Sequence, residues 1–256
     1  MTKALLTLAA LAALATAPAH AKEPIFVSPA QTHTYDILPT PPADDSEITK
    51  AELAELHAIE LTRTEPQSKQ AIWDDENEHF FIYQNVLGDN FTEAKLPLVA
   101  AFGKRVRNDE GLNAGPAKIG FHRVRPYNLD KTLKPICKTK TKDDSYPSGH
   151  TTTGFLLGLT LIDMVPEKRD AILARAEQYG HNRLICGVHY ASDIPASKLV
   201  AYVTHAVMAQ NPDYQKEMAA ARTELRSVLG LPAELPAPPA TAVKAEVAAP
   251  AVSATK

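Results

Sequence analysis

The segment that decides the fold is SYPSGHTTTGFLLGLTLIDMV, residues 145–165. Pro147, Ser148 and Gly149 are residue types that form turns, whereas the apolar run that follows His150 is typical of a buried helix. The segment therefore predicts a turn that leads into a helix of the core. It also brings a hydroxyl group, a glycine backbone and an imidazole into three consecutive positions, and the rest of the chain must decide whether they serve structure or function.

Helical patterns separated by helix breakers cover most of the remaining chain. Thr49 and Glu52 form an expected capping box. Thr92 is an expected N-cap, and Gly88 an expected C-terminal stop. The helical segments span residues 51–61, 68–88, 91–106, 150–165, 166–180, 192–211 and 212–230. Because no series of alternating strands accompanies them, we predict an all-α protein with one helical-bundle domain over residues 46–230.

The first residues, 1–21, have the order of a secretory signal. Lys3 precedes an apolar run, 4–15, and Ala19-His20-Ala21 has the small-x-small form of a cleavage site. The apolar run is shorter than the roughly 20 residues that span a bilayer. Export with cleavage after Ala21 is therefore favoured over a membrane anchor, and no membrane span is expected in the mature chain.

The two flanks of the domain and the two cysteines give further expectations. Residues 22–45 are rich in proline and lack periodicity, so they predict an extended arm. Residues 231–256 alternate proline with alanine and predict a disordered tail. In an exported protein Cys137 and Cys186 would form one disulfide, and two buried free thiols are the alternative.

Composition excludes one class of function. The formal net charge is −3 at pH 7, with 45% hydrophobic and 22% charged residues, which is ordinary for a soluble globular protein. The chain is therefore not expected to bind nucleic-acid polymers through bulk positive charge. Any basic site must be local.

Three islands of basic and histidine residues interrupt the helical pattern. They hold Lys118 and Arg125 in the first, Ser148, Gly149 and His150 in the second, and Arg183, His189 and Asp193 in the third. Each island alone has an ordinary explanation, because most Lys and Arg side chains lie on solvated faces. His189 and Asp193 alone have the spacing of an i, i+4 helix pair.

Together, the islands supply what phosphoryl transfer without a metal requires. Negative charge spreads over three equatorial oxygens during transfer, so several cationic donors must surround one point. Lys118, Arg125 and Arg183 would provide that charge. Ser148 would add a hydroxyl donor, and Gly149 would let backbone N–H groups approach the anion.

The two histidines would divide the covalent work. Asp193 would hold His189 in the tautomer whose free nitrogen faces the substrate, so that His189 attacks phosphorus and becomes a phosphohistidine. His150 would protonate the leaving alkoxide and then activate a water molecule. We expect activity to favour mildly acidic pH, where His150 is still protonated and His189 is partly neutral.

The islands follow the order K-x6-RP, PSGH and R-x5-H-x3-D. This order resembles the signature of the type 2 phosphatidic acid phosphatase and vanadium haloperoxidase superfamily. Within this superfamily, the chain is similar to the bacterial class A non-specific acid phosphatases over about residues 75–225. The similarity is carried by the segments SYPSGHTTTGF and RLICGVHYASD and by the export signal. The resemblance implies an all-helical domain, a periplasmic location and hydrolysis of many small phosphomonoesters without a metal or other cofactor. It gives the eight island residues the roles derived above, and it makes a homo-oligomer possible.

Some positions depart from the family pattern or stay open. Asn182 stands where the third motif usually has serine. Because an amide also donates and accepts hydrogen bonds, we expect a site with altered properties rather than an inactive one. Tyr190 stands where close relatives often have tryptophan. His122 and Arg123 are expected at the surface, and Tyr146 either lines the pocket or packs beneath it.

Three alternative functions share the same anion pocket. A lipid phosphate phosphatase uses the same catalytic residues but usually spans a membrane. A vanadate-dependent haloperoxidase would hold vanadate as its cofactor. A non-catalytic phosphate-binding protein would need the donors, but not a histidine with an orienting carboxylate.

Overall fold

The computed structural model describes residues 22–139 and 141–237. The expected signal peptide, 1–21, and most of the expected tail lie outside these residues. Within them the chain forms helices and connecting segments and no strand. The all-α prediction is confirmed.

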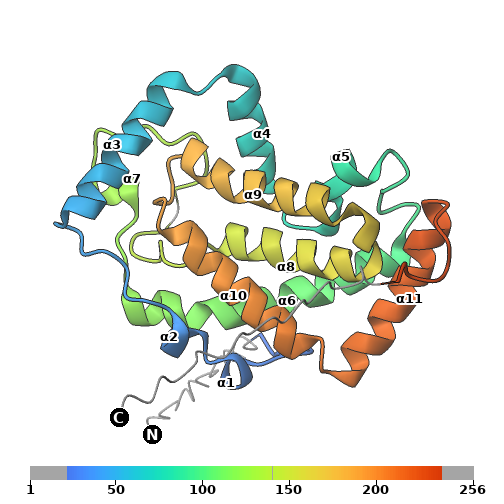
Figure 1. Ribbon diagram of the computed structural model, residues 1–256. Coiled ribbons are helices and arrows are strands. Elements are labelled where there is room, and N and C mark those ends of the chain that lie inside the picture. The colour runs from blue at the N-terminus through green and yellow to red at the C-terminus, as the bar shows by residue number, and fades with distance from the viewer. Residues whose placement is uncertain (1–21, 140, 238–256) are drawn as a thin grey trace, which may run out of the picture.

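Seven long helices form the body, and shorter turns connect them (Figure 1). The long helices are α3 (Glu47–Thr62), α4 (Glu65–Glu76), α6 (Pro97–Phe121), α8 (Gly149–Met164), α9 (Arg169–Ile185), α10 (Asp193–Met208) and α11 (Pro212–Val228). The short elements are α1 (Pro29–Thr32), α2 (Thr34–Ile37), η1 (Phe80–Tyr83), α5 (Gln84–Leu87), α7 (Pro126–Leu129) and η2 (Pro166–Lys168).

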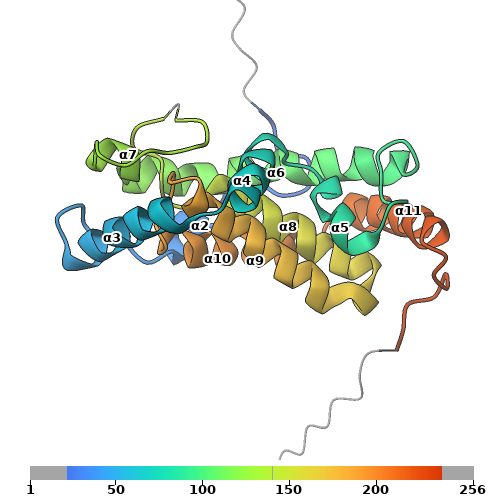
Figure 2. The ribbon, with the colours of Figure 1, turned by 90° about the horizontal axis from the view of Figure 1, so that it is seen from above.

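Helix α8 is the centre of the bundle and packs against α6, α9, α10 and α11. Figure 2 shows it between α6 on one side and α9 and α10 on the other. Two of its glycines permit close contact: a Cβ on Gly154 would lie 2.7 Å from the ring of Tyr179, and one on Gly158 would lie 2.6 Å from the hydroxyl of Tyr83. A side chain at either glycine would force these buried tyrosines out of place.

The segment before α8 begins that helix as predicted. Ser148 is the N-cap, and its hydroxyl accepts a hydrogen bond from the backbone N–H of Thr151 at 3.3 Å. Apolar side chains such as Leu156 and Leu157 then become fully buried. Each buried leucine contributes about 2 kcal/mol to folding, so this cap and this core hold the turn in place.

Several predicted helix boundaries are wrong. Ser46, and not Thr49, caps α3, because the Ser46 hydroxyl accepts from the N–H of Thr49. The predicted helix 68–88 is interrupted after Glu76, where an extended segment precedes η1. Helix α6 begins at Pro97 and continues to Phe121, so it includes the first residue of the basic islands.

The arm 22–45 lies along the bundle and contains α1 and α2. Asp109 on α6 accepts hydrogen bonds from the backbone N–H groups of Ile25, Phe26 and Val27, at 2.6–2.9 Å. The side chains of Phe26 and Val27 are buried in the main core. These contacts attach the start of the described chain to the middle of α6.

Candidate active site

The three islands come from separate elements that meet at one end of α8. Lys118 lies in the last turn of α6, and Arg183 in the last turn of α9. Arg125 precedes α7. One residue from each island, Arg125, His150 and Arg183, lines a pocket of about 340 Å³ whose other lining residues are Asp75, Glu76, Glu78, Lys138 and Thr141. The structure therefore brings the islands together.

His189 is held between an acceptor and a donor. Its Nδ1 lies 3.0 Å from Oδ2 of Asp193, and its Nε2 lies 2.8 Å from a terminal guanidinium nitrogen of Arg125. A carboxylate accepts and a guanidinium donates, so Nδ1 carries the proton and Nε2 has its lone pair. Burial and the charges of Arg125, Arg183 and Lys118 lower the pKa of His189 well below its usual value. The imidazole is therefore neutral, and the lone pair of Nε2 accepts a hydrogen bond from Arg125.

Asp193 begins α10 and is itself fixed by three further donors. Arg123 donates to Oδ1 at 2.7 Å, while the Ser145 hydroxyl and the Tyr190 N–H donate to Oδ2 at 2.7 and 3.0 Å. Its side chain is fully buried. Burial raises the pKa of this carboxyl, and the charge of Arg123 with these hydrogen bonds partly offsets that rise. The same bonds set the direction in which the carboxylate meets His189.

Arg123 is not at the surface, so that prediction is wrong. Its side chain is 1% exposed and joins Asp193 to Glu52 of α3, each at 2.7 Å. The guanidinium also lies 4.0 Å from the centre of the Tyr190 ring. The sequence suggested exposure because most arginines are exposed, but α3 covers this end of the bundle and supplies the second carboxylate.

His150 lies in the first turn of α8, beside acidic groups. Its Nε2 lies 3.1 Å from the carbonyl oxygen of Asp75 and 3.5 Å from Oε1 of Glu78. Its ring stacks on Tyr179. Burial, with the nearby charge of Arg183, lowers the pKa of His150 to about 4. This value differs from the expectation of a protonated His150 at mildly acidic pH, because the sequence does not show how deeply the ring is buried.

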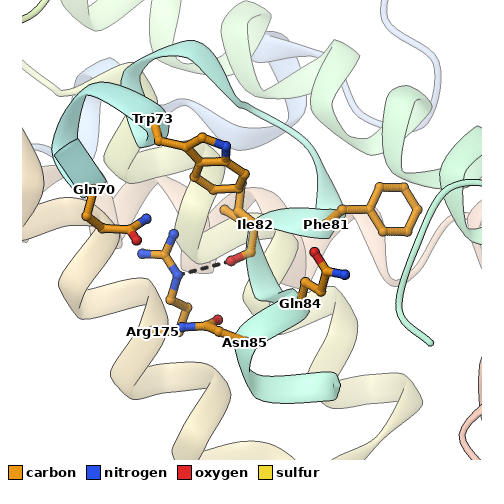
Figure 3. Close-up of a pocket in the computed structure, with 7 residues that line it drawn as sticks. All are labelled: Gln70, Trp73, Phe81, Ile82, Gln84, Asn85 and Arg175. Carbon is orange, nitrogen blue, oxygen red and sulfur yellow. Dashed lines mark hydrogen bonds between the residues drawn. The ribbon is translucent and has the colours of Figure 1, made fainter. Parts of the chain in front are cut away.

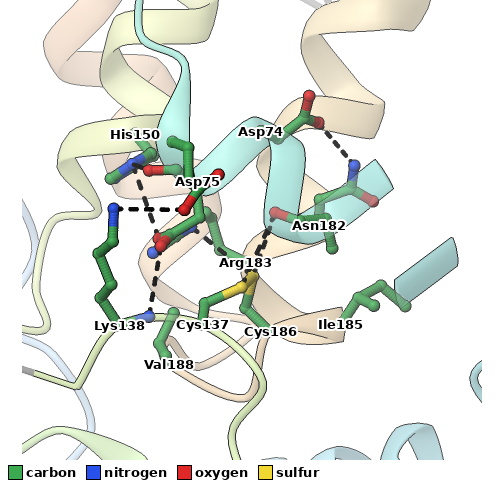
Figure 4. The surroundings of a disulfide bond; sticks show 12 residues. Asp74, Asp75, Cys137, Lys138, His150, Asn182, Arg183, Ile185, Cys186 and Val188 are labelled. Atoms are coloured by element: carbon green, nitrogen blue, oxygen red, sulfur yellow. Dashed lines mark hydrogen bonds and ion pairs between the residues drawn. A yellow bond between two sulfur atoms is a disulfide. The ribbon is translucent and has the colours of Figure 1, made fainter. Parts of the chain in front are cut away.

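Arg183 is held between the disulfide and a carboxylate. Cys137 and Cys186 form a disulfide next to it, and the same guanidinium donates to Asp75 at 2.7 Å (Figure 4). Burial opposes ionisation of Asp75, but the charge and hydrogen bond of Arg183, the N–H of Lys138 and the charge of His150 together outweigh burial and lower the pKa of that carboxyl. Within the described ranges, the buried Nε of Arg183 has no hydrogen-bond acceptor. An arginine with a buried free donor at a pocket wall is suited to an anion.

Lys118 closes the turn before α8. Its Nζ donates to the carbonyl oxygens of Asp144 and Pro147, at 2.7 and 2.6 Å. Burial, together with the charge of Arg125, lowers the pKa of Lys118 to about 8. A Cβ on Gly149 would lie 4.0 Å from Lys118 Cε, so the lysine and the first backbone turn of α8 lie side by side.

Three further residues discussed in the sequence, Asn182, Tyr146 and His122, lie outside the group around His189. Asn182 is buried and donates to Oδ2 of Asp74 at 2.6 Å, so it braces α9 against α4. Tyr146 is buried, and its hydroxyl donates to the carbonyl oxygen of Pro39, so Tyr146 packs against the arm. His122 is exposed, as expected.

Sequence reasoning missed the acidic residues of the site. Asp75 and Glu78 come from the end of α4 and the segment after it, and Asp144 pairs with Nε of Arg125 at 2.8 Å. Glu110 of α6 is buried near Gly149. Acidic residues are common on solvated faces, and no local pattern distinguishes these from the others.

A second pocket is lined by residues of α4, η1, α5 and α9 and by none of the island residues. It measures about 260 Å³ and is bordered by Trp73, Phe81 and Arg175 together with three amide side chains (Figure 3). Arg175 there donates to the carbonyl oxygen of Ile82 and to Asp74. These bonds occupy the guanidinium in holding helices together, so the pocket beside His189 is the candidate site.

Comparisons with known proteins identify relatives of this chain. A family model described as the PAP2 superfamily matches residues 108–217. An acid phosphatase of Zymomonas mobilis is 36% identical over 148 residues, 56% of this chain and 55% of its own length. A non-specific acid phosphatase of Providencia stuartii is 34% identical over 148 residues, 56% of this chain and 59% of its own length.

A longer match defines the family. A non-specific acid phosphatase of Salmonella typhimurium is 31% identical over 208 residues, which are 78% of this chain and 83% of that protein. The chain therefore belongs to the PAP2 superfamily, in the group of non-specific acid phosphatases. The matches to the first two relatives span just over half of each relative's length.

Proposed function

We propose that this protein is an exported acid phosphatase that hydrolyses small phosphomonoesters to alcohol and inorganic phosphate through a phosphohistidine. The observation that carries the proposal is the position of His189, whose Nδ1 meets Asp193 while its Nε2 meets Arg125. A binding protein needs the cations around the pocket, but it does not need a neutral imidazole oriented by a buried carboxylate.

Substrate binding would begin at the cations. A phosphate dianion would take hydrogen bonds from Arg125, Arg183 and the backbone N–H groups at the start of α8. Because Arg125 donates to Nε2 of His189 in the free protein, the phosphate would draw this donor onto its own oxygen. Binding the substrate would thereby uncover the lone pair of Nε2.

In the first chemical step, Nε2 of His189 would form a bond to phosphorus while the bond from phosphorus to the ester oxygen breaks. His150 would give its proton to the departing alkoxide. Asp193 would stabilise the positive charge that develops on the His189 ring, through the hydrogen bond at Nδ1. In the second step His150 would take a proton from water, whose oxygen attacks phosphorus and releases His189 and inorganic phosphate.

His150 would acquire its acid form only with the substrate. Its pKa of about 4 in the free protein reflects burial and the charge of Arg183. A phosphate dianion would bind Arg183 and place negative charge near the imidazole, and both effects favour the protonated ring. The proton needed by the leaving group would therefore enter with the substrate, which supports turnover at mildly acidic pH.

The disulfide supports the proposed location. The Cys137–Cys186 disulfide fits an oxidising compartment such as the periplasm, which the export signal at residues 1–21 predicts. In the parts of the chain described, no helix combines the length and apolar character of a membrane span. The same parts hold no group of three or more His, Cys, Asp or Glu side chains arranged as metal ligands, and the proposal gives charge neutralisation to Lys118, Arg125 and Arg183.

The test is p-nitrophenyl phosphate hydrolysis at about pH 6 with excess EDTA, for the wild type, His189→Ala and His181→Ala. His181 is an exposed histidine on α9, close to the site in sequence, and serves as the matched control. We expect turnover in the wild type and the control but none in His189→Ala. An acid-labile phosphoenzyme, trapped by rapid quenching, should appear only in the two active proteins. Turnover by His189→Ala would overturn the assignment of the nucleophile.

A further inference from the structure

A buried carboxyl group lies directly behind the turn that begins α8. Glu110 of α6 is 3% exposed. Its Oε1 lies 3.6 Å from the place that a Cβ on Gly149 would occupy, and Lys118 Cε lies 4.0 Å from the same place. Among the residues described, this Oε1 has no hydrogen-bond partner. An unpartnered carboxyl oxygen therefore faces the start of α8, where the proposed phosphate would bind.

The charges around Glu110 do not neutralise it fully. Arg107 and Lys118 of its own helix favour the carboxylate, while Glu78, from the segment after α4, opposes it. Arg107 is itself paired with Glu78, so its charge is shared. Helix α8 contributes no charge toward Glu110 and offers the Thr153 hydroxyl. An ionised Glu110 would therefore place negative charge behind the anion site.

We propose that Glu110 controls anion affinity by its proton: as a neutral acid it leaves the start of α8 open to a phosphate dianion, and as a carboxylate it repels that dianion. This inference rests on the phosphate pocket of the proposed function and adds a residue that none of the three islands contains. Glu110 does not touch the phosphate in this scheme. It acts through the electrostatic potential at the backbone N–H groups of the first turn of α8, which begins at Gly149.

The titration ranges of the neighbouring groups support this role. Burial raises the pKa of Glu110 to about 7, so the carboxyl ionises just above mildly acidic pH. His150, with a pKa of about 4, and His189, with a pKa well below its usual value, have already lost their protons at that point. Lys118 loses its charge only near pH 8. Between about pH 6 and 7, Glu110 is thus the group of the free site whose charge changes most.

The experiment compares inorganic phosphate binding by wild type and Glu110→Gln, using calorimetry at pH 5 and pH 8. The ionisation of phosphate itself cancels in the ratio of the two dissociation constants at each pH. We expect a ratio near one at pH 5. At pH 8 the wild type should bind on the order of 10-fold more weakly than the variant, because two like charges several ångströms apart repel strongly in a partly buried site. A ratio that stays the same at both pH values would overturn the proposal.

A matched control and a second measurement complete the test. Glu93→Gln removes an exposed carboxylate that pairs with Lys104, and its ratio to wild type should not change with pH. If Glu110→Gln does not fold, carbon-13 NMR of glutamate carboxyl groups in the wild type decides instead. One carboxyl should titrate near pH 7 and shift to higher pKa when phosphate binds, and the absence of such a signal would contradict the proposal.

Two measurements distinguish failure of the proposed function from failure of the role proposed for Glu110. Wild-type turnover of p-nitrophenyl phosphate at pH 5 reports on catalysis, whereas the phosphate dissociation constants report on Glu110. A protein that binds phosphate with the expected pH-dependent ratio but shows no turnover would contradict the phosphatase proposal alone. Turnover together with a constant ratio would contradict only the role of Glu110.

Discussion

Arg125 donates to Nε2 of His189 at 2.8 Å, so in the free protein a side chain proposed to bind phosphate covers the nitrogen proposed to attack phosphorus. The arginine cannot serve Nε2 and a phosphate oxygen with the same N–H. If the substrate takes this N–H, as we propose, Nε2 becomes available only when the pocket is filled. One hydrogen bond would then link substrate binding to the reactivity of His189.

Replacement of Asp193 by asparagine should lower kcat on the order of 1,000-fold. The amide would no longer accept strongly from Nδ1, so the His189 tautomer with a free Nε2 would lose its stabilisation. Stopped assays with p-nitrophenyl phosphate measure kcat, and calorimetry checks that phosphate still binds. Asp163→Asn, which alters the partner of the distant His205, is the control. Equal kcat in Asp193→Asn and the control would contradict the orienting role.

Replacement of Arg123 by methionine should lower the free energy of unfolding by about 3 kcal/mol, because two buried carboxylates would lose their shared cation. Those carboxylates belong to Glu52 and Asp193. Urea denaturation measures the change. Adding Glu52→Gln to the Arg123→Met variant should restore part of the stability, since one uncompensated charge is then removed. A single variant as stable as the wild type would show that the buried pairs are not required.

Reduction of the Cys137–Cys186 disulfide should lower stability by about 4 kcal/mol in the chain-entropy model, given a sequence separation of 49 residues. It should also weaken phosphate binding, because the N–H of Lys138 next to the bridge donates to Asp75, the partner of Arg183. Denaturation with and without dithiothreitol gives the first quantity, and Cys137→Ser/Cys186→Ser gives both without a reductant. Unchanged phosphate affinity in that variant would separate the disulfide from the site.

Glu110 also predicts a pH dependence of stability. Its pKa is raised from 4.5 to about 7 in the folded protein, so its neutral form is favoured by folding. The contribution is fully present below pH 4.5 and is lost as the pH rises through 7. Relative to wild type, Glu110→Gln should therefore gain about 3 kcal/mol between pH 4 and pH 8. Urea denaturation at these two pH values measures the gain. A difference in the free energy of unfolding between variant and wild type that is the same at both pH values would mean that folding does not raise the pKa of Glu110.

The spacing of residues along the chain was enough to predict the helical class and the three islands. Helix patterns, caps and breakers act over a few residues, and the turn before α8 was predicted because Ser148 and the apolar run after it are adjacent. Boundaries that depend on neighbouring helices were predicted wrongly. The N-cap of α3 is Ser46 rather than Thr49, and the helix predicted over residues 68–88 is interrupted after Glu76.

The sequence by itself determined which residues carry charge, imidazole and hydroxyl groups, and it linked them to one chemistry. Only the tertiary structure decided how those groups are paired. Arg183 meets a carboxylate 108 positions away, and Arg123 joins partners 71 and 70 positions away. Glu110 reaches Gly149 because α6 packs against α8. Such pairs depend on how helices pack over one another, and burial then sets their pKa values, which local sequence does not encode.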